Sequence, residues 1–263
     1  MEKKIVTLLA EHWHTCGVEQ GDILLVHSNI TKLLFIIYKK YGFKATPQTI
    51  YDSLLYALGD EGTLVLPLFN FDFPQTKFFD IRNTPSQMGV LTEMGRNDPK
   101  SVRTGHPIYS FSIVGKQATE FKNIDNYSGY GADSPFAKIL ELDGKIAIIG
   151  LTDQETMTSY HFIEEQTLVD YRYFKEFNGT YINNKGESTE KVYALYVRDL
   201  DRGVTTNLNR MMEYLWQNGF YKGERPEEGY GMRTIKMRDL YNQTEKIIRD
   251  GKAIDYLYSI QKD

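Results

Sequence analysis

The first third of the chain alternates between segments with helically spaced apolar residues and short, wholly apolar runs. Residues 3 to 16 carry apolar side chains at helical intervals, and the run GDILLVHS after them predicts a buried strand. A second helix is expected from Pro47 to Leu58, with Gly59 as its stop, before the strand TLVLPLF. This alternation favours an α/β fold in which helices cover a mixed sheet.

The remaining segments extend this pattern and then change it. Two tyrosine-rich stretches, YRYFKEFNGTYINN and STEKVYALYVRD, predict antiparallel strands with a turn at Asn-Gly or at Asn-Lys-Gly. No Pro/Ser-rich linker divides the chain, so we expect one domain over residues 1–263 with a β-rich subregion at 168–205. Further helices are expected in PSQMGVLTEMGR, residues 135–142, TSYHFIEEQ, residues 207–216 and residues 241–257, and a buried strand in KIAIIGL.

Composition limits the possible partners. The 263 residues carry a net charge of -4, which argues against a nucleic-acid-binding surface. No segment has the ~18 unbroken apolar residues of a membrane span, so no membrane partner is expected. The single cysteine, Cys16, cannot form an internal disulfide, and no apolar run precedes it, which favours a cytoplasmic location. A homodimer is possible.

The stretch TSYHFIEEQ carries the main candidate for catalysis. With Thr158 or Ser159 as the N-cap, His161 falls in the first helical turn, where the helix dipole favours the neutral imidazole. Glu164 and Glu165 follow at i+3 and i+4, so either carboxylate can accept a hydrogen bond from the ring and fix its tautomer. A neighbouring carboxylate also raises the pKa of a histidine, and the sequence alone does not decide between the two effects. An ordinary charged helix start remains the alternative.

The other histidines and the cysteine give weaker signals. His12 and His14 are two residues apart and do not share a helix face, and no acidic or cysteine partner is spaced for zinc, so no metal is expected. Cys16 lies at a helix C-terminus, where the dipole opposes a thiolate. The sequence contains no nucleophile elbow, phosphate-binding loop or dinucleotide fingerprint.

Six separated stretches together resemble one family. They are VHSN (26–29), GDEGTLVLPLFNFDF (59–73), FDIRNTPSQMGVLTE (79–93), SVRTGHPIYSFSIVG (101–115), YGADSPFAKILELDGKIAIIGL (130–151) and TSYHFIEE (158–165). Their order and spacing resemble the aminoglycoside 3-N-acetyltransferase family, also called the antibiotic N-acetyltransferase family. The resemblance covers residues 18 to 170 well and the rest of the chain weakly.

The resemblance implies the antibiotic N-acetyltransferase fold and an acetyl-CoA-dependent N-acetyltransferase without a metal. His161 matches the family's active-site histidine and Glu164 its partner. A neutral histidine could take the proton from an ammonium acceptor, and donors near Ser28 could stabilise the oxyanion. The residues that match the family's cofactor-bordering segments are His27, Ser28, Asn29 (where a second serine is usual), Arg103, Thr104, His106, Pro107 and the following Ser110. Arg103 is expected to contact a CoA phosphate, unless it forms an ordinary ion pair.

We expect a small-molecule amine as the acceptor, and the sequence departs from the family pattern after VHSN. After VHSN the chain has the longer, aromatic and basic stretch ITKLLFIIYKKYGFKATPQ in place of a short glycine-containing loop. Few acids surround His161, whereas Tyr171 and Arg172 follow closely and suit a nucleotide-linked sugar. We therefore expect a nucleotide-linked amino sugar of surface-polysaccharide biosynthesis as the acceptor, bound by Glu165, Tyr171 and Arg172. The alternatives are an aminoglycoside, with antibiotic resistance as the outcome, a non-catalytic CoA-binding relative, and more distantly a metal-dependent hydrolase.

Overall fold

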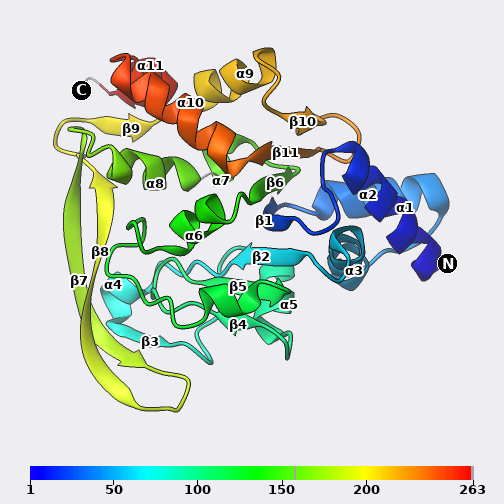
Figure 1. Cartoon of the computed structure of the whole chain (residues 1–263), viewed down its shortest axis with the longest axis horizontal. Helices are drawn as coiled ribbons and strands as arrows, with labels where there is room; N and C mark the ends of the chain where they lie inside the picture. Colours follow the sequence, from blue (N-terminus) through cyan, green and yellow to red (C-terminus); the bar gives the residue numbers. More distant parts are fainter. Residues whose placement is uncertain (157, 262–263) are drawn as a thin grey trace.

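The structure, a computed structural model, describes residues 1–156 and 158–261. Its central sheet has seven strands in the order β10 (Lys222–Gly223), β11 (Met232–Lys236), β6 (Lys145–Ile149), β1 (Ile23–Ser28), β2 (Thr63–Pro67), β5 (Phe111–Gly115) and β4 (Val102–Arg103) (Figure 1). The inner strands β6, β1 and β2 are parallel, and the outer strands are antiparallel to their neighbours. The expected mixed sheet is confirmed.

Helices cover both faces of this sheet. One face packs against α1 (Glu2–Thr15), α2 (Thr31–Tyr41), α3 (Pro47–Leu58) and α5 (Val90–Asn97). The other face packs against α6 (Pro135–Glu141), α8 (Ser159–Gln166), α9 (Asn209–Gln217) and α10 (Met237–Arg249). Short helical turns complete the set: α4 (Phe73–Thr76), η1 (Ala118–Phe121), α7 (Asp153–Thr156) and α11 (Ala253–Tyr256).

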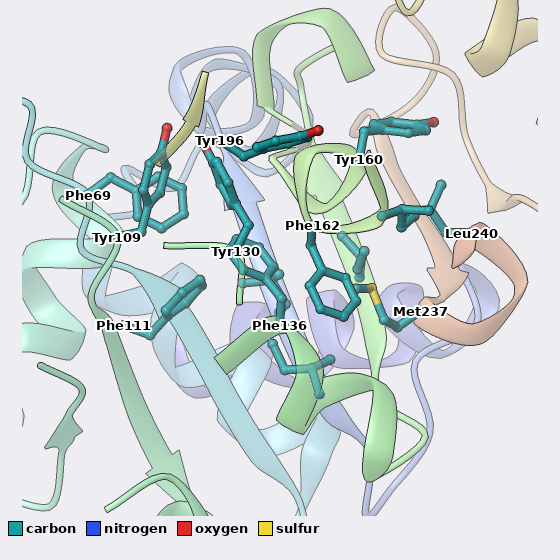
Figure 2. Packing of buried hydrophobic residues seen from close by; sticks show 14 of the residues in the cluster. Phe69, Tyr109, Phe111, Tyr130, Phe136, Tyr160, Phe162, Tyr196, Met237 and Leu240 are labelled. Carbon is teal, nitrogen blue, oxygen red and sulfur yellow. The ribbon is translucent and has the colours of Figure 1, made fainter. Parts of the chain in front are cut away.

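The side chains of the inner strands alternate between two hydrophobic cores. In β1, Leu24 and Val26 enter the core beneath α1 to α3, whereas Ile23 and Leu25 enter the core on the opposite face. A strand that is buried on both faces is apolar throughout, which explains the unbroken run ILLV. Figure 2 shows the aromatic part of the second core, where Phe136 lies among other aromatic rings.

The tyrosine-rich region forms a long hairpin at the side of the molecule away from α1 to α3 (Figure 1). Strands β7 (Arg172–Ile182) and β8 (Ser188–Arg198) pair antiparallel over their full lengths, as expected. The turn lies at the Asn-Lys-Gly position, where Asn183 N–H donates to Glu187 O at 3.0 Å. The Asn-Gly alternative is wrong: Gly179 lies inside β7, where a Cβ would come within 2.6 Å of the Lys77 carbonyl oxygen.

Three short strands lie beside the hairpin region. Strand β3 (Phe78–Asp80) pairs parallel with β7, and β9 (Val204–Thr206) pairs antiparallel with β12 (Tyr258–Ile260).

The stretch after β1, which is longer than the glycine-containing loop of the family pattern, is mostly the helix α2. Leu33 and Ile37 lie four residues apart and are buried, and Gly42 ends the helix with φ 63°. The apolar residues therefore have an ordinary packing role. None of the helices in the described residues combines the length and the hydrophobicity needed to cross a bilayer.

We expect Phe136→Ala to lower the free energy of unfolding by about 3–5 kcal/mol, because it removes a fully buried ring. That ring contacts Phe111 at 5.1 Å and Phe162 at 6.2 Å between centroids. Urea titration measures the change. Tyr56→Ala is the control, since the Tyr56 side chain is exposed. An equal loss of stability in both variants would contradict the packing described for Phe136.

We also expect acid to destabilise the fold through two buried histidines. Burial lowers the pKa of both His27 and His106 to about 4 from an unfolded value near 6.5. The unfolded chain therefore binds more protons between these values, and stability falls as the pH drops from 6.5 towards 4, by roughly 3 kcal/mol for each histidine. Melting temperatures across this range measure the effect. His106→Gln should flatten the profile and replacement of the exposed His14 should not; identical profiles would refute the assignment.

Candidate active site

A cleft of about 570 Å³ lies at the carboxyl ends of the parallel strands β1, β2 and β6. Loops diverge at this edge of an open α/β sheet, which makes it the usual place for a ligand site. Three of its walls come from the ends of these strands: residues 27–31 at the end of β1, Pro67, Phe69 and Phe71 at the end of β2, and Leu151 with residues 153–156 after β6. The start of α5 and Thr158, His161, Thr206 and Leu208 complete the lining.

Helix α8 places His161 in the wall of this cleft. His161 N–H donates to the Thr158 carbonyl at 2.9 Å, so the residue lies in the first turn, as expected. The expected side-chain cap is absent, because neither Thr158 nor Ser159 directs its hydroxyl to a hydrogen-bond partner among the described residues. The backbone alone therefore starts this helix.

Glu164 is the carboxylate that contacts the imidazole. Its Oε2 lies 2.8 Å from Nδ1 of His161, one helical turn away, and its side chain is 2% exposed. Tyr171 donates its hydroxyl to the other oxygen, Oε1, at 2.9 Å. A proton on Nδ1 that points to Glu164 leaves Nε2 with the lone pair. The ring therefore has its basic nitrogen available on the side away from Glu164.

Arg172 contacts both His161 and Glu164. Its Nε lies 2.7 Å from Glu164 Oε2, and its Nη2 lies 2.8 Å from His161 Nδ1. Nδ1 cannot accept from Arg172 while it donates to Glu164, so only one of these contacts to the ring is a hydrogen bond. We assign the bond to the carboxylate, because an ionised acceptor gives the stronger, charge-assisted interaction. Arg172 then acts on the ring through its charge.

Burial and the charges in this cluster together set the protonation states of His161 and Glu164. Burial lowers the pKa of His161, the Arg172 cation lowers it further, and Glu164 only partly opposes them. Burial disfavours ionisation of Glu164, but Arg172 and the donors His161 and Tyr171 outweigh it, so the pKa of Glu164 lies below its ordinary value. A neutral histidine therefore faces an ionised glutamate at neutral pH. Burial, rather than the helix dipole expected from the sequence, is the main cause.

The structure brings one group of predicted cofactor residues to the cleft. His27, Ser28 and Asn29 leave the end of β1 and line it together with His161. His27 Nε2 is buried without a hydrogen-bond partner among the described residues. Asn29 Oδ1 accepts from the Thr31 N–H at 3.2 Å, so its side chain also supports the start of α2.

The second group of predicted cofactor residues does not line this cleft. Arg103 donates to the carbonyls of Ile81 and Thr84 at 3.0 and 2.6 Å and to the Ser110 hydroxyl. These bonds join β4 to the segment after β3, a structural use that the sequence left open. Thr104, His106 and Ser110 are fully buried and bond to backbone groups of the same region.

The three predicted substrate residues also have internal partners. Glu165 points away from the cleft and accepts from the Ser128 hydroxyl at 2.6 Å. Tyr171 and Arg172 hold Glu164, as described above, and neither lines the cleft. Their positions suit support of the His161–Glu164 pair better than contact with an acceptor.

Sequence reasoning missed a buried ion pair at the floor of the cleft. Asp153 and Arg233 are both 0% exposed, and Arg233 Nη2 lies 2.8 Å from Asp153 Oδ1. The hydroxyls of Tyr160 and Tyr221 donate to the other oxygen at 2.7 and 2.6 Å. The position of Asp153 just after the buried strand β6 was a usable signal. Nothing local marked Arg233, which comes from the antiparallel neighbour β11.

Known proteins with similar sequences and structures share one description. The chain is 27% identical over 179 residues to aminoglycoside N(3)-acetyltransferase VII of Streptomyces paromomycinus, and 29% identical over 160 residues to aminoglycoside N(3)-acetyltransferase IV of a Salmonella species. These matches cover 60% and 59% of this chain but only 59% and 56% of the relatives. A solved structure described as AAC-IIIb in a binary complex with CoASH superposes with a TM-score of 0.77 at 18% identity, covering 98% of each chain. That likeness confirms the fold.

These relatives overturn the acceptor expected from the sequence. The nucleotide-linked amino sugar of surface-polysaccharide biosynthesis was inferred from Tyr171, Arg172 and the scarcity of acids. The relatives are aminoglycoside enzymes by name, and the two residues that suggested a nucleotide hold Glu164 instead. The expectation is wrong, and the aminoglycoside alternative fits better.

The match also extends over most of the sequence. The family model described as aminoglycoside 3-N-acetyltransferase aligns with residues 25–249, which include every strand of the central sheet except the first two residues of β1. The aligned range contains the cleft and the His161–Glu164 pair. The chain belongs to the aminoglycoside 3-N-acetyltransferase family.

Proposed function

We propose that this protein transfers the acetyl group of acetyl-CoA to an amino group of an aminoglycoside. The observation that carries the proposal is the neutral His161, which Glu164 orients while the ring lines a cleft large enough for a ligand. A volume of about 570 Å³ lies within the range of small-molecule sites. Family membership supplies the reaction class.

The cleft has features that suit acetyl-CoA. His27 Nε2 is a buried polar atom in need of a partner, and the apolar rings of Phe69 and Phe71 line the same cleft. Gly89 to Thr92, at the start of α5, form another part of the wall, and the first N–H groups of a helix attract anions such as phosphates. Acetyl-CoA supplies the acetyl group as a thioester, whose carbonyl carbon is open to attack by a neutral amine.

His161 would make the acceptor nucleophilic. An amine attacks only as the free base, so its ammonium form must first lose a proton, and Nε2 of His161 can accept it. The ring then becomes an imidazolium beside the Glu164 carboxylate, which stabilises the charge and holds the ring in its orientation. As the amine nitrogen bonds to the acetyl carbon, the C–S bond breaks and CoA leaves as the thiolate, which can take up the proton that the imidazolium releases. Tyr171 and Arg172 prevent Glu164 from turning away.

Two further groups in the cleft have roles in this proposal. The backbone N–H of Asn29 already donates to the Ile149 carbonyl at 2.8 Å, so we assign the Ser28 hydroxyl, which lines the cleft at the end of β1, as a donor to the developing oxyanion. Asp153 is neutralised by Arg233, so Glu155 is the cleft carboxylate that remains for a second ammonium group of the acceptor. A polycationic acceptor would then sit towards the α7 side of the cleft.

We expect His161→Ala to reduce acetylation of an aminoglycoside by a factor on the order of 10²–10⁴, because it removes the base. Glu164→Gln should have a smaller effect, since it keeps the shape but removes the charge that stabilises the imidazolium. Release of the CoA thiol in the presence of an aminoglycoside panel measures the rate, and resistance of an expressing strain gives a second reading. The matched control is His14→Ala, remote from the cleft.

Unchanged turnover in His161→Ala would remove the mechanism. Binding of acetyl-CoA by the unaltered protein without turnover of any aminoglycoside would remove the proposed function and favour a non-catalytic relative.

We expect Arg172→Gln to move the acidic limb of the kcat/KM profile to higher pH. The Arg172 cation lowers the pKa of His161, so its removal raises that pKa and the base is protonated over a wider range. The free amine of the acceptor titrates identically in both proteins, so it does not affect the difference. Arg202→Gln is the control, since Arg202 is an exposed partner of Asp170. A shift in the opposite direction would contradict the assigned role of the charge.

A further inference from the structure

A second cluster of reactive side chains lies outside the cleft, between α1 and the link that joins β10 to β11. His12 and Cys16 are four residues apart on one face of α1, and Glu224 reaches them from that link. His12 Nε2 lies 3.2 Å from Glu224 Oε1 and 3.6 Å from Cys16 Sγ. From the sequence we expected no acidic or cysteine partner for His12, whereas in the structure Cys16 and Glu224 both lie beside it.

The spacing of these three atoms matches one face of a tetrahedral metal site. Zinc bonds to nitrogen and oxygen at ~2.0–2.2 Å and to sulfur at ~2.3 Å, so tetrahedral ligands lie about 3.3–3.6 Å from one another. The two measured separations fall close to this range, and all three atoms lie within 4.8 Å of one another. Binding would require Cys16 Sγ and the Glu224 oxygen, which lie no more than 4.8 Å apart, to come within about 3.6 Å of each other.

The donor set is also the one that zinc prefers. A thiolate, a neutral imidazole and a carboxylate together carry two negative charges, which a divalent ion neutralises in this partly buried place. On binding, the Cys16 thiol loses its proton to the buffer and the His12 ring keeps its proton on Nδ1. Cys16 is buried, whereas His12 and Glu224 are partly exposed, which gives an ion a route from solvent.

Backbone groups hold the Glu224 carboxylate in position. Its Oε2 accepts from the N–H groups of Tyr230 and Gly231 at 2.7 and 3.1 Å, so Oε1 is turned towards His12. Gly229 leaves room for the carboxylate, because a Cβ there would lie 1.9 Å from Oε1. Tyr230 also packs edge-on against the His12 ring at 4.7 Å. Such outer contacts orient ligands in metal sites.

We propose that His12 Nε2, Cys16 Sγ and Glu224 bind one zinc ion, with water as the fourth ligand. The ion joins the N-terminal helix to residues 224–231, whose Pro226 and Glu227 carbonyls accept from Lys32 of α2. Helix α2 begins at Thr31, which lines the cleft. The bound ion therefore stabilises residues 224–231, which hold α2 in the cleft wall, and it takes no part in acetyl transfer.

The test adds Zn²⁺ or Co²⁺ to the full chain after chelation. We expect one ion per chain, a rise in melting temperature, and with Co²⁺ a near-ultraviolet sulfur-to-cobalt charge-transfer band. Cys16→Ala should abolish the band, and Glu224→Gln, which can retain the bonds to Tyr230 and Gly231, should weaken binding by roughly 10–100-fold. His14→Gln is the matched control, because His14 lies on the same helix and its Nδ1 bonds to Val18 O.

Two outcomes would overturn the proposal. The first is the absence of a cobalt–thiolate band in the folded, unaltered protein, which would leave the three residues as a hydrogen-bonded group. The second is equal metal binding by Cys16→Ala and the unaltered protein, which would place the ion elsewhere. Circular dichroism shows whether each variant folds. If Cys16→Ala does not fold, the metal affinity of Glu224→Gln provides the test.

Discussion

The candidate site depends on one buried carboxylate. Glu164 is almost fully shielded from water, and a charge in that position is tolerated only when it is paired and hydrogen-bonded. Arg172 supplies the opposite charge, and Tyr171 and His161 supply donors. The same contacts tie the β7–β8 hairpin to α8 and fix the imidazole. Stability and the proposed catalytic role thus both require that this carboxylate stays in place.

The parallel core of the sheet explains where the cleft forms. Strands β6, β1 and β2 end at one edge, and the segments that leave them diverge there. His27 to Asn29 lie at the end of β1, and the chain after β6 leads to α7 and then to α8, which carries His161. Residues far apart in the chain are therefore gathered by strand pairing. The rings of Phe69 and Phe71, after β2, close a third side.

Much of the architecture could be read from local patterns. The helix at residues 47–58 was placed by Pro47 and Gly59, and the pairing of His161 with Glu164 follows from helical spacing alone. The stretch after β1 was harder to interpret. This stretch is longer than the glycine-containing loop of the family pattern, which suggested an insertion. Leu33 and Ile37 nevertheless have the spacing of a helix. The partners of Arg103, Tyr171 and Arg172 could not be predicted, because each contact crosses between elements.

The sequence by itself determined the layered α/β plan, the order of the elements and the pairing of His161 with Glu164, because these depend on repeats of two to four residues. Only the tertiary structure decided that Tyr171 and Arg172 support Glu164, that Asp153 meets Arg233, and that Glu224 reaches His12 and Cys16. Those contacts depend on which strands pair and how helices pack across the sheet. Such long-range geometry arises from the packing of the whole chain and leaves no local periodicity in the sequence.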